Sequence, residues 1–317
     1  MNSITQIKPR QLCPGDTIGV VAPASSGDWE TALQGISWLK ECGFQVKLGK
    51  TVNQITKGYL SGTDADRASD INDMFASPEI DGIVCLRGGY GTMRILDLLD
   101  YNIIKTHPKV FVGYSDITAL HISIMQNTGL VTFHGPMVAS DMDKDLSAYT
   151  WDCFSRAVFS DQPLGLISNP PLFPAAKFIV PGTAQGYLTG GNLSLITATL
   201  GTPYEINTEG KILCLEDIGE APYRIDRMLT QLLLADKLQV AAGIVFAVCA
   251  DCDSVAEPPD YLVENVLLDR LGDLKMPVLC DLYFGHTTDK ATLPLGVTAT
   301  LGNKGRGLVI TEAATTK

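Results

Sequence analysis

The sequence predicts an α/β protein built around a parallel sheet. Short and almost continuously apolar runs alternate with segments of helical periodicity through the first half of the chain. Strands of this composition are buried on both faces, as in parallel sheets that helices cover on each side. In such sheets ligands bind beyond the carboxyl ends of the strands, so the residues that follow each strand are the first candidates for a functional site.

The first half supplies these elements in strictly alternating order. Each strand is a run of four to six mostly apolar residues, and the first helix is ended by a glycine at residue 43. The predicted elements are a strand at 17–22, a helix at 29–41, strands at 83–86 and 109–113, and a helix at 117–125.

Proline marks a change of organisation after residue 161. Five prolines between residues 161 and 182 exclude a long helix or a central strand there. We therefore expect an N-terminal α/β domain at 1–165, a proline-rich linker at 166–182 and a C-terminal domain at 183–317. The elements expected in the last of these are strands at 184–188, 211–215, 243–248 and 277–282, helices opened by Pro222 and at about 261–271, and a hairpin of 296–301 and 307–311 around Gly302-Asn303.

Charge and hydropathy exclude several classes of partner. The chain has 24 basic and 35 acidic side chains, a formal charge of -11, which argues against binding to nucleic acid or to an anionic membrane surface. The longest apolar run, Val240–Ala250, is too short to cross a bilayer, which takes roughly 20 residues. The first ten residues lack the apolar core of a signal peptide, so we expect a cytoplasmic location.

The eight cysteines do not resemble a disulfide framework. Four of them, at 85, 214, 249 and 280, lie in apolar strand-like runs, where a free cysteine behaves as a small buried hydrophobe. Cys249-Ala-Asp-Cys252 matches Cys-x-x-Cys, a pattern typical of redox sites and of half a zinc site. No second pair or histidine follows at metal spacing, so we interpret this match as coincidental.

Gly113-Tyr-Ser-Asp116 is the motif that most narrows the function. Ser115 ends an apolar run and opens a helical segment, so we expect it on a sharp strand-to-helix turn. Such a turn lifts the hydroxyl out of the carboxyl edge of the sheet and points the backbone N–H of Asp116 at an oxygen that gains negative charge. The motif predicts a nucleophile elbow.

The elbow departs from Gly-x-Ser-x-Gly because Ile117 replaces the second glycine, so steric relief must come from elsewhere. The alternative interpretation is that Ser115 or Asp116 only caps a helix, which both residue types do well.

A serine nucleophile needs a base, and the chain has four histidines. His107 precedes a proline in a loop, and His121 lies about 240° around the helix from Ser115, so we expect both to be structural. His134 and His286 each follow or end a predicted strand. Either can be the base on spacing alone.

The orienting carboxylate has two candidates, Glu216 and Asp217, at the end of the strand at 211–215. Strand alternation sends them to opposite faces, so one can serve the site while the other caps a helix or pairs with an arginine. The glycine turns Arg87–Gly91 and Gly190–Asn192 match neither the P-loop nor the dinucleotide fingerprint. We expect the first to bring its backbone close to a substrate or an oxyanion, with a plain tight turn as the alternative.

At these residues the chain resembles the LD-carboxypeptidases, a serine peptidase family that includes muramoyltetrapeptide carboxypeptidase and the microcin C self-immunity peptidase. The resemblance spans almost the whole chain and follows the family's motif order. The motifs that carry it are Val21-Ala-Pro-Ala24, Leu86-Arg-Gly-Gly-Tyr-Gly91, Gly113-Tyr-Ser-Asp116, Phe133-His-Gly-Pro136, Gly190-Gly-Asn192, Leu215-Glu-Asp217 with Tyr223-Arg-Ile-Asp-Arg227, and Phe284-Gly-His286.

The resemblance implies Ser115 as nucleophile, His286 as general base and Glu216 as the acid that orients it, with His134 structural. It also implies an oxyanion hole formed by the backbone amides of Asp116 and Gly89. The implied fold is a flavodoxin-like N-terminal domain and a smaller swivelling β/β/α C-terminal domain, in a homodimer that needs no metal and no organic cofactor.

The implied activity is hydrolysis of the L,D-peptide bond to the terminal D-alanine of murein tetrapeptides, in cell-wall recycling. The partner is then a muropeptide or another peptide with a free C-terminal carboxylate, for which Arg87, Arg94, Arg224 and Arg227 are candidate cations. The alternatives are microcin-immunity-type hydrolysis of peptidyl-nucleotide amides, and a binding protein without catalysis that captures a small ligand.

Overall fold

The structure, a computed structural model, describes residues 5–143, 145–253, 261–302 and 307–317. The chain divides into two compact units with a boundary between Gln162 and Pro163. The first unit also takes in Thr292–Gly296 and Ala313–Lys317, and the second unit comprises Pro163–Ala291 and Val297–Glu312.

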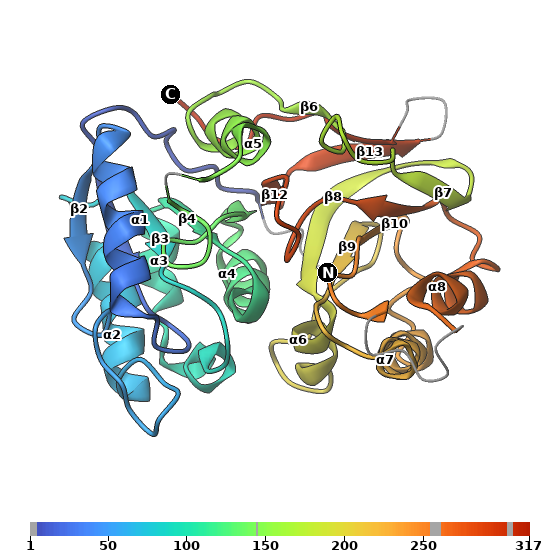
Figure 1. The fold of residues 1–317 in the computed structure, drawn as a ribbon, viewed down its shortest axis with the longest axis horizontal. Coiled ribbons are helices and arrows are strands. Elements are labelled where there is room, and N and C mark those ends of the chain that lie inside the picture. Colours follow the sequence, from blue (N-terminus) through green and yellow to red (C-terminus); the bar gives the residue numbers. More distant parts are fainter. Residues whose placement is uncertain (1–4, 144, 254–260, 303–306) are drawn as a thin grey trace. The chain divides into compact units, whose positions relative to one another are not determined.

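The first unit contains a six-stranded sheet in the order β12-β5-β4-β3-β1-β2 (Figure 1). The strands are β1 (Thr17–Val21), β2 (Gln45–Leu48), β3 (Gly82–Cys85), β4 (Val110–Gly113), β5 (Thr132–His134) and β12 (Leu293–Leu295). The first five are parallel in the flavodoxin-like order 2-1-3-4-5, and β12 adds to β5 as an antiparallel edge. The predicted parallel α/β sheet is confirmed.

The helices of the first unit begin where short polar side chains cap them. Asp28, Thr63 and Ser147 each accept a hydrogen bond from a backbone N–H in the first turn of the following helix. The helical segments are α1 (Trp29–Glu41), α2 (Asp64–Ala76), α3 (Tyr101–Thr106), α4 (Thr118–Thr128) and α5 (Ala148–Val158), with short 3₁₀ turns η1 (Thr92–Arg94), η2 (Leu96–Leu98) and η3 (Ser115–Ile117).

The second unit contains an eight-stranded mixed sheet in the order β6-β14-β13-β8-β9-β10-β11-β7. The four strands from β8 to β11 are parallel neighbours, and the outer strands pair antiparallel. The strands are β6 (Gly165–Ile167), β7 (Lys177–Val180), β8 (Thr183–Asn192), β9 (Ile212–Glu216), β10 (Gly243–Ala247), β11 (Val278–Leu282), β13 (Thr298–Gly302) and β14 (Gly307–Ile310).

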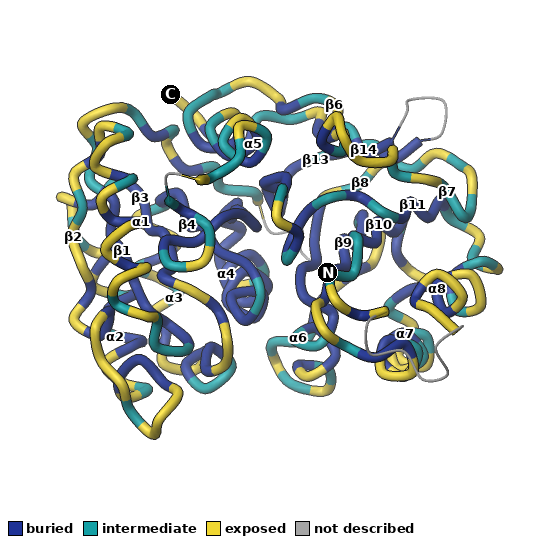
Figure 2. Tube along the Cα trace, in the orientation of Figure 1, coloured by how far each residue is buried: buried dark blue, intermediate teal, exposed yellow. Residues whose placement is uncertain are grey.

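The described residues of this unit form the helices α6 (Leu193–Ala198), α7 (Pro222–Leu234) and α8 (Val263–Leu271). Pro222 stands in the first turn of α7, where its missing N–H costs no hydrogen bond. Strands β9 and β10 are buried along their whole length, as Figure 2 shows in dark blue. Glu216 is the last residue of β9, so it stands at the carboxyl edge of this sheet.

The structure differs from the expected domain division at the proline-rich segment. Residues 166–182 contain most of β6 and all of β7, which are strands of the second sheet, so this segment is not a linker. Its prolines, at 170, 171, 174 and 181, are compatible with these strands because all of them lie outside β6 and β7. The C-terminal part of the chain is also divided between the two units, because β12 belongs to the first sheet and β13 and β14 belong to the second.

The predicted C-terminal hairpin is confirmed in its strands, because β13 and β14 pair antiparallel from Ala299↔Ile310 to Gly302↔Gly307. The residue Asn303 of its expected turn lies outside the described residues. Within the described parts of the chain, no helix is both long and apolar enough to span a bilayer.

Candidate active site

Ser115 stands on a strained turn between β4 and α4. Its φ is +63°, in the left-handed region that a residue with a side chain occupies at a cost of roughly 1–3 kcal/mol. Asp116 and Ile117 are buried, whereas Ser115 is half-buried. The turn therefore presents the serine hydroxyl while it hides its neighbours, which is the geometry predicted for the nucleophile elbow.

Gly113 supplies the steric relief that the missing second glycine would otherwise give. A methyl group added to Gly113 would lie 2.9 Å from Cγ1 and 3.0 Å from Cγ2 of Ile117. The side chain of Ile117 thus fills the space that Gly113 leaves empty. The elbow tolerates Ile117 because Gly113, two residues before the serine, has no side chain in the space that the isoleucine fills.

The glycine turn at residues 87–91 lies against the elbow. A methyl group on Gly88 would be 2.7 Å from Cβ and 2.9 Å from Oγ of Ser115, and 3.3 Å from the backbone nitrogen of Asp116. Gly89, with φ +105°, lies instead against the side chain of Ser25, whose Oγ accepts a hydrogen bond from the Tyr90 N–H at 3.1 Å. Only glycine at position 88 leaves space beside the serine hydroxyl.

Two hydrogen bonds tie the end of this turn to the elbow. The Thr92 N–H donates to Oδ2 of Asp116 at 2.8 Å, and the Thr92 hydroxyl donates to the Asp116 carbonyl at 2.6 Å. Burial raises the pKa of the Asp116 carboxyl to about 6, although its hydrogen bonds with Thr92 act in the opposite direction.

A buried arginine, Arg67, is hydrogen-bonded to the same turn. Arg67 is fully buried and donates to the carbonyls of Pro23 and Gly91, and it pairs with Asp64. Asp64 also accepts two hydrogen bonds from Arg94, at 2.9 and 2.6 Å, and this pairing lowers the pKa of Asp64 to about 2. Arg94, one of the four candidate cations, is thereby held by Asp64.

In the second unit, His286 and Glu216 form a hydrogen-bonded pair. Nδ1 of His286 lies 2.6 Å from Oε2 of Glu216; Glu216 is fully buried and the His286 side chain is 13% exposed. Burial by itself lowers the pKa of His286, but the hydrogen bond and the negative charge of Glu216 outweigh it and raise the pKa above its ordinary value of 6.5. A proton held on Nδ1 leaves Nε2 as the acceptor nitrogen.

Gly285 makes this pair possible. Its φ is +77°, and a methyl group there would lie 2.5 Å from Oε2 and 2.6 Å from Cδ of Glu216. The backbone after β11 therefore passes directly over the buried carboxylate and delivers the imidazole of His286 to it.

Asp217, the residue that follows β9, makes contacts different from those of Glu216. Its carboxylate accepts hydrogen bonds from the Asn192 amide, from the N–H and the hydroxyl of Ser194, and from the Ile218 N–H. It does not pair with an arginine in these contacts but holds the start of α6. Of the two candidate carboxylates, only Glu216 contacts a histidine.

The other three histidines lie in the first unit. His121 is buried, and its Nε2 lies 2.8 Å from the Gly113 carbonyl, while burial lowers its pKa to about 3. His107 contacts Thr106 and the Ile103 carbonyl at the end of α3. His134 is buried in β5, with its ring 5.9 Å from that of Tyr114.

The remaining candidate cations differ in their surroundings. Arg224 lies 3.4 Å from Glu220 and stacks on the ring of Tyr223. Arg227 is exposed on α7. Arg87 is exposed and donates to the Ser26 carbonyl at 3.3 Å, directly before the glycine that faces Ser115. In the described ranges, no three His, Cys, Asp or Glu side chains gather as a metal site would need.

A half-buried serine on a strained strand-to-helix turn and a histidine oriented by a buried glutamate are the components of a serine hydrolase. The model of the LD-carboxypeptidase N-terminal domain matches residues 18–135, and that of the LD-carboxypeptidase C-terminal domain matches residues 185–301. The chain belongs to the LD-carboxypeptidase family, and it is a serine-type carboxypeptidase.

Three relatives illustrate the range of this family. The chain is 42% identical to a Bacillus subtilis protein named probable murein peptide carboxypeptidase, over 96% of this chain and 94% of the relative. It is 30% identical to the Escherichia coli microcin C7 self-immunity protein MccF, over 95% and 94%. The crystal structure of muramoyltetrapeptide carboxypeptidase from Oxalobacter formigenes is similar with a TM-score of 0.82 at 30% identity, covering 94% of this chain and all of that one.

The sequence named Ser115, Glu216 and His286 as catalytic candidates but assigned no role to several residues that contact them or their neighbours. Gly88, Gly285 and Thr92 have no catalytic chemistry of their own, and α2 with its buried Arg67 was not predicted at all. The first two carried a detectable signal, because each is a glycine next to a motif residue.

Proposed function

We propose that this carboxypeptidase hydrolyses the L,D-peptide bond to the terminal D-alanine of murein tetrapeptides. The observation that carries the proposal is Ser115 on its strained turn, with a glycine on the side where a substrate carbonyl must approach. The names of the Bacillus subtilis and Oxalobacter formigenes relatives support murein peptides as the substrate class.

In this mechanism Ser115 acts together with the His286–Glu216 pair. Nε2 of His286 takes the serine proton, and Glu216 holds the proton on Nδ1 and stabilises the imidazolium that forms. The serine oxygen attacks the carbonyl of the L-centre, and His286 then protonates the departing D-alanine. A water molecule repeats the sequence and releases the shortened peptide. The 2.6 Å hydrogen bond and the raised pKa of His286 support its role as base.

The oxyanion is held in this proposal by the backbone amides of Asp116 and Gly89. The Asp116 N–H lies in the first turn after the elbow, where a helix N-terminus favours negative charge. The Gly88–Gly89 peptide belongs to the turn that packs on Ser115. Both amides belong to segments that the Thr92–Asp116 hydrogen bonds hold together.

Arg87 is our choice for the cation that binds the terminal carboxylate of the substrate. The protein carries a formal charge of -11, so an anionic group needs a local positive charge. Arg94 is paired with Asp64 and Arg224 lies against Glu220, whereas Arg87 is exposed, donates to the Ser26 carbonyl and stands next to Gly88.

The test is mass spectrometry of a muropeptide digest. The purified enzyme is expected to remove one alanine from the tetrapeptide and to leave the tripeptide and the pentapeptide unchanged, and the Ser115→Ala variant is expected to leave all three peptides unchanged. Cleavage of the pentapeptide, or release of a residue other than alanine, would contradict the proposed bond.

Hydrolysis of peptidyl-nucleotide amides is the second candidate, because MccF is also a relative. The nucleobase of such a substrate needs an aromatic surface. Trp151 is packed against other aromatic rings instead, 5.0 Å from Trp38 and 5.7 Å from Phe159. The murein peptide is therefore the preferred substrate, and a peptidyl-nucleotide amide in the same assay compares the two directly.

We also propose that the enzyme works as a homodimer in the cytoplasm, where recycled muropeptides are available. Both points rest on the family resemblance and on the substrate proposed above. Sedimentation equilibrium of the purified protein tests the first, and fractionation of the cells that produce it tests the second.

A further inference from the structure

Cys249 and Cys252 are joined in a disulfide just beyond β10. Their Cα atoms are 5.6 Å apart, and the six other cysteines are free. The interpretation of this Cys-x-x-Cys match as coincidental is therefore corrected. The proposed hydrolysis uses neither sulfur, so the pair needs an explanation of its own.

The bond is too local to serve mainly as a staple. It joins residues only three positions apart, and in the chain-entropy model a disulfide stabilises a fold in proportion to the logarithm of the loop that it closes. A short Cys-x-x-Cys loop is instead the arrangement in which thiol-disulfide exchange is fast, because the second sulfur stays next to the first.

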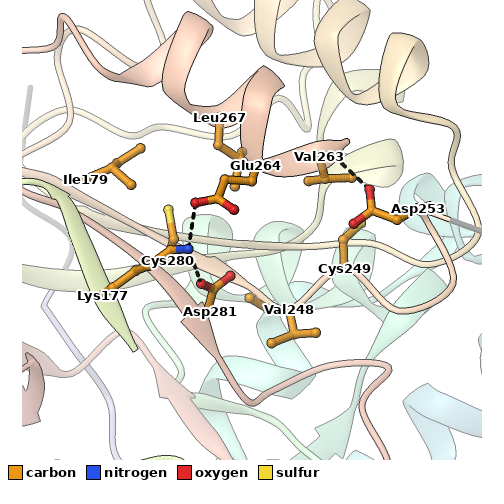
Figure 3. A pocket seen from close by; sticks show the side chains of 11 residues that line it. Lys177, Ile179, Val248, Cys249, Asp253, Val263, Glu264, Leu267, Cys280 and Asp281 are labelled. Carbon is orange, nitrogen blue, oxygen red and sulfur yellow. Dashed lines mark hydrogen bonds and ion pairs between the residues drawn. The ribbon is translucent and has the colours of Figure 1, made fainter. Parts of the chain in front are cut away.

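The two sulfurs differ in access. Cys249 is part-exposed and lines a cavity of about 160 Å³, whereas Cys252 is fully buried. Figure 3 shows the cavity, with Lys177 between the carboxylates of Glu264 and Asp281 at distances of 2.8 and 3.2 Å. An incoming thiolate can reach Cys249 from this cavity, and Cys252 is then the leaving group. Cys280 lines the same cavity, but burial raises its pKa to about 12, so it stays a thiol.

The disulfide loop is hydrogen-bonded to the segment that follows Glu216. Ile218 and Ala250 form a parallel bridge, and the Gly219 N–H donates to the Ala250 carbonyl at 2.8 Å. The Sγ atom of Cys249 lies 3.5 Å from the Asp217 carbonyl oxygen. A thiol at Cys249 can donate a hydrogen bond to this oxygen, whereas a disulfide sulfur has no proton to donate.

We propose that Cys249 and Cys252 form a redox-active dithiol/disulfide site that exchanges with low-molecular-weight thiols, and that its state acts on the neighbouring Glu216–His286 pair. On oxidation by a disulfide RSSR, the Cys249 thiolate displaces RS⁻ and forms a mixed disulfide. The Cys252 thiol, after losing its proton, attacks the Cys249 sulfur and displaces the second RS⁻. Two protein thiols are oxidised and RSSR is reduced to two RSH. Only the consequence of this coupling for catalysis rests on the proposed function.

The first experiment counts thiols and needs no activity. The full-length protein is equilibrated in buffers that range from reduced to oxidised glutathione, quenched with acid, alkylated and weighed intact. We expect a single step of two thiols, absent from the Cys249→Ser and Cys252→Ser variants and kept in Cys13→Ser, which removes another part-exposed cysteine. Eight alkylated cysteines at every ratio, or a pair that excess dithiothreitol does not open, would overturn the redox site.

The same variants identify the exchanging sulfur. With oxidised glutathione, Cys252→Ser is expected to trap a mixed disulfide on Cys249, and Cys249→Ser is expected to trap none. The reverse pattern would overturn the assignment of Cys249 as the attacked sulfur.

The coupling is measured by NMR titration of the His286 ring in the oxidised and reduced protein, with Cys252→Ser as a form that cannot close the bond. We expect a different His286 pKa in the two states and no redox dependence in the variant. Identical titration curves in the oxidised and reduced protein would overturn the coupling. This readout does not depend on murein being the substrate, so it fails or succeeds separately from the proposed function.

Discussion

Thr92 donates two hydrogen bonds to Asp116, one from its main chain to the Asp116 side chain and one from its side chain to the Asp116 main chain. The Thr92 N–H donates to the Asp116 carboxylate at 2.8 Å, and the Thr92 hydroxyl donates to the Asp116 carbonyl at 2.6 Å. Thr92 ends the glycine turn, and Asp116 follows the nucleophile. The two segments proposed to supply the oxyanion amides are therefore fastened to each other next to the serine.

Replacing Thr92 with valine keeps the shape of the side chain and removes its hydroxyl. We expect the free energy of unfolding to fall by about 1 kcal/mol, the usual net contribution of one hydrogen bond, and kcat to fall with little change in KM, because the loss affects the oxyanion amides. Denaturant unfolding and steady-state kinetics measure the two effects. Thr92→Ser keeps the hydroxyl and is the matched control; a valine variant with the kcat of the serine variant would contradict this role.

Ser115 is expected to separate activity from stability. Both Ser115→Ala and Ser115→Gly should lower kcat by about 10⁴-fold or more, because each removes the nucleophile. Glycine occupies φ +63° without strain, so the free energy of unfolding of the glycine variant should be about 1 kcal/mol higher than that of the alanine variant. Thermal and denaturant unfolding of the two variants check this. Equal stabilities would show that the elbow is not strained.

Gly88→Ala is expected to damage catalysis while leaving the fold intact. The added methyl group would lie 2.7 Å from Cβ of Ser115, so the serine or the turn must shift by several tenths of an ångström. A misplacement of about 1 Å at a reacting group can cost on the order of 10²-fold in rate, and we expect kcat to fall by this order. Gly88 does not have a positive φ, so alanine causes no backbone strain there. A variant with wild-type kcat would exclude a close approach of this turn to the substrate.

The charge of Glu216 is expected to set the acid limb of the pH profile. His286 must be neutral to accept the serine proton, and its raised pKa places the loss of activity, as pH falls, above pH 6.5. Glu216→Gln removes the charge, so the His286 pKa should decrease and kcat should fall by about 10⁴-fold because the tautomer is no longer fixed. NMR titration of the His286 ring measures the pKa directly. An unchanged pKa in the variant would contradict the pairing.

Arg87→Gln is expected to raise KM for peptides with a free C-terminal carboxylate by roughly 10- to 100-fold, the range for a lost hydrogen bond to a charged group. The variant and the wild-type enzyme should cleave C-terminally amidated peptides with similarly poor KM values. Arg227→Gln, which changes an exposed arginine of the second unit, is the matched control. If the amidated peptide is cleaved as well as the free acid by the wild-type enzyme, Arg87 has no such role.

The sequence was informative where local chemistry decides local structure. A glycine and a serine between an apolar run and a helical run predicted the elbow, and strand alternation predicted separate roles for Glu216 and Asp217, which have different partners. The proline-rich segment misled the domain division, because its prolines lie between and beside β6 and β7 and leave room for these two short strands.

The sequence by itself determined the fold class, the turn at Ser115 and the short list of polar groups at the carboxyl ends of the strands, since these follow from periodicity and from the conformations that glycine permits. Only the tertiary structure decided which carboxylate meets His286, which glycine faces Ser115, and that Cys249 and Cys252 are bonded. Each of these depends on how closely two segments approach, and in a packed interior the space for one methyl group decides that approach.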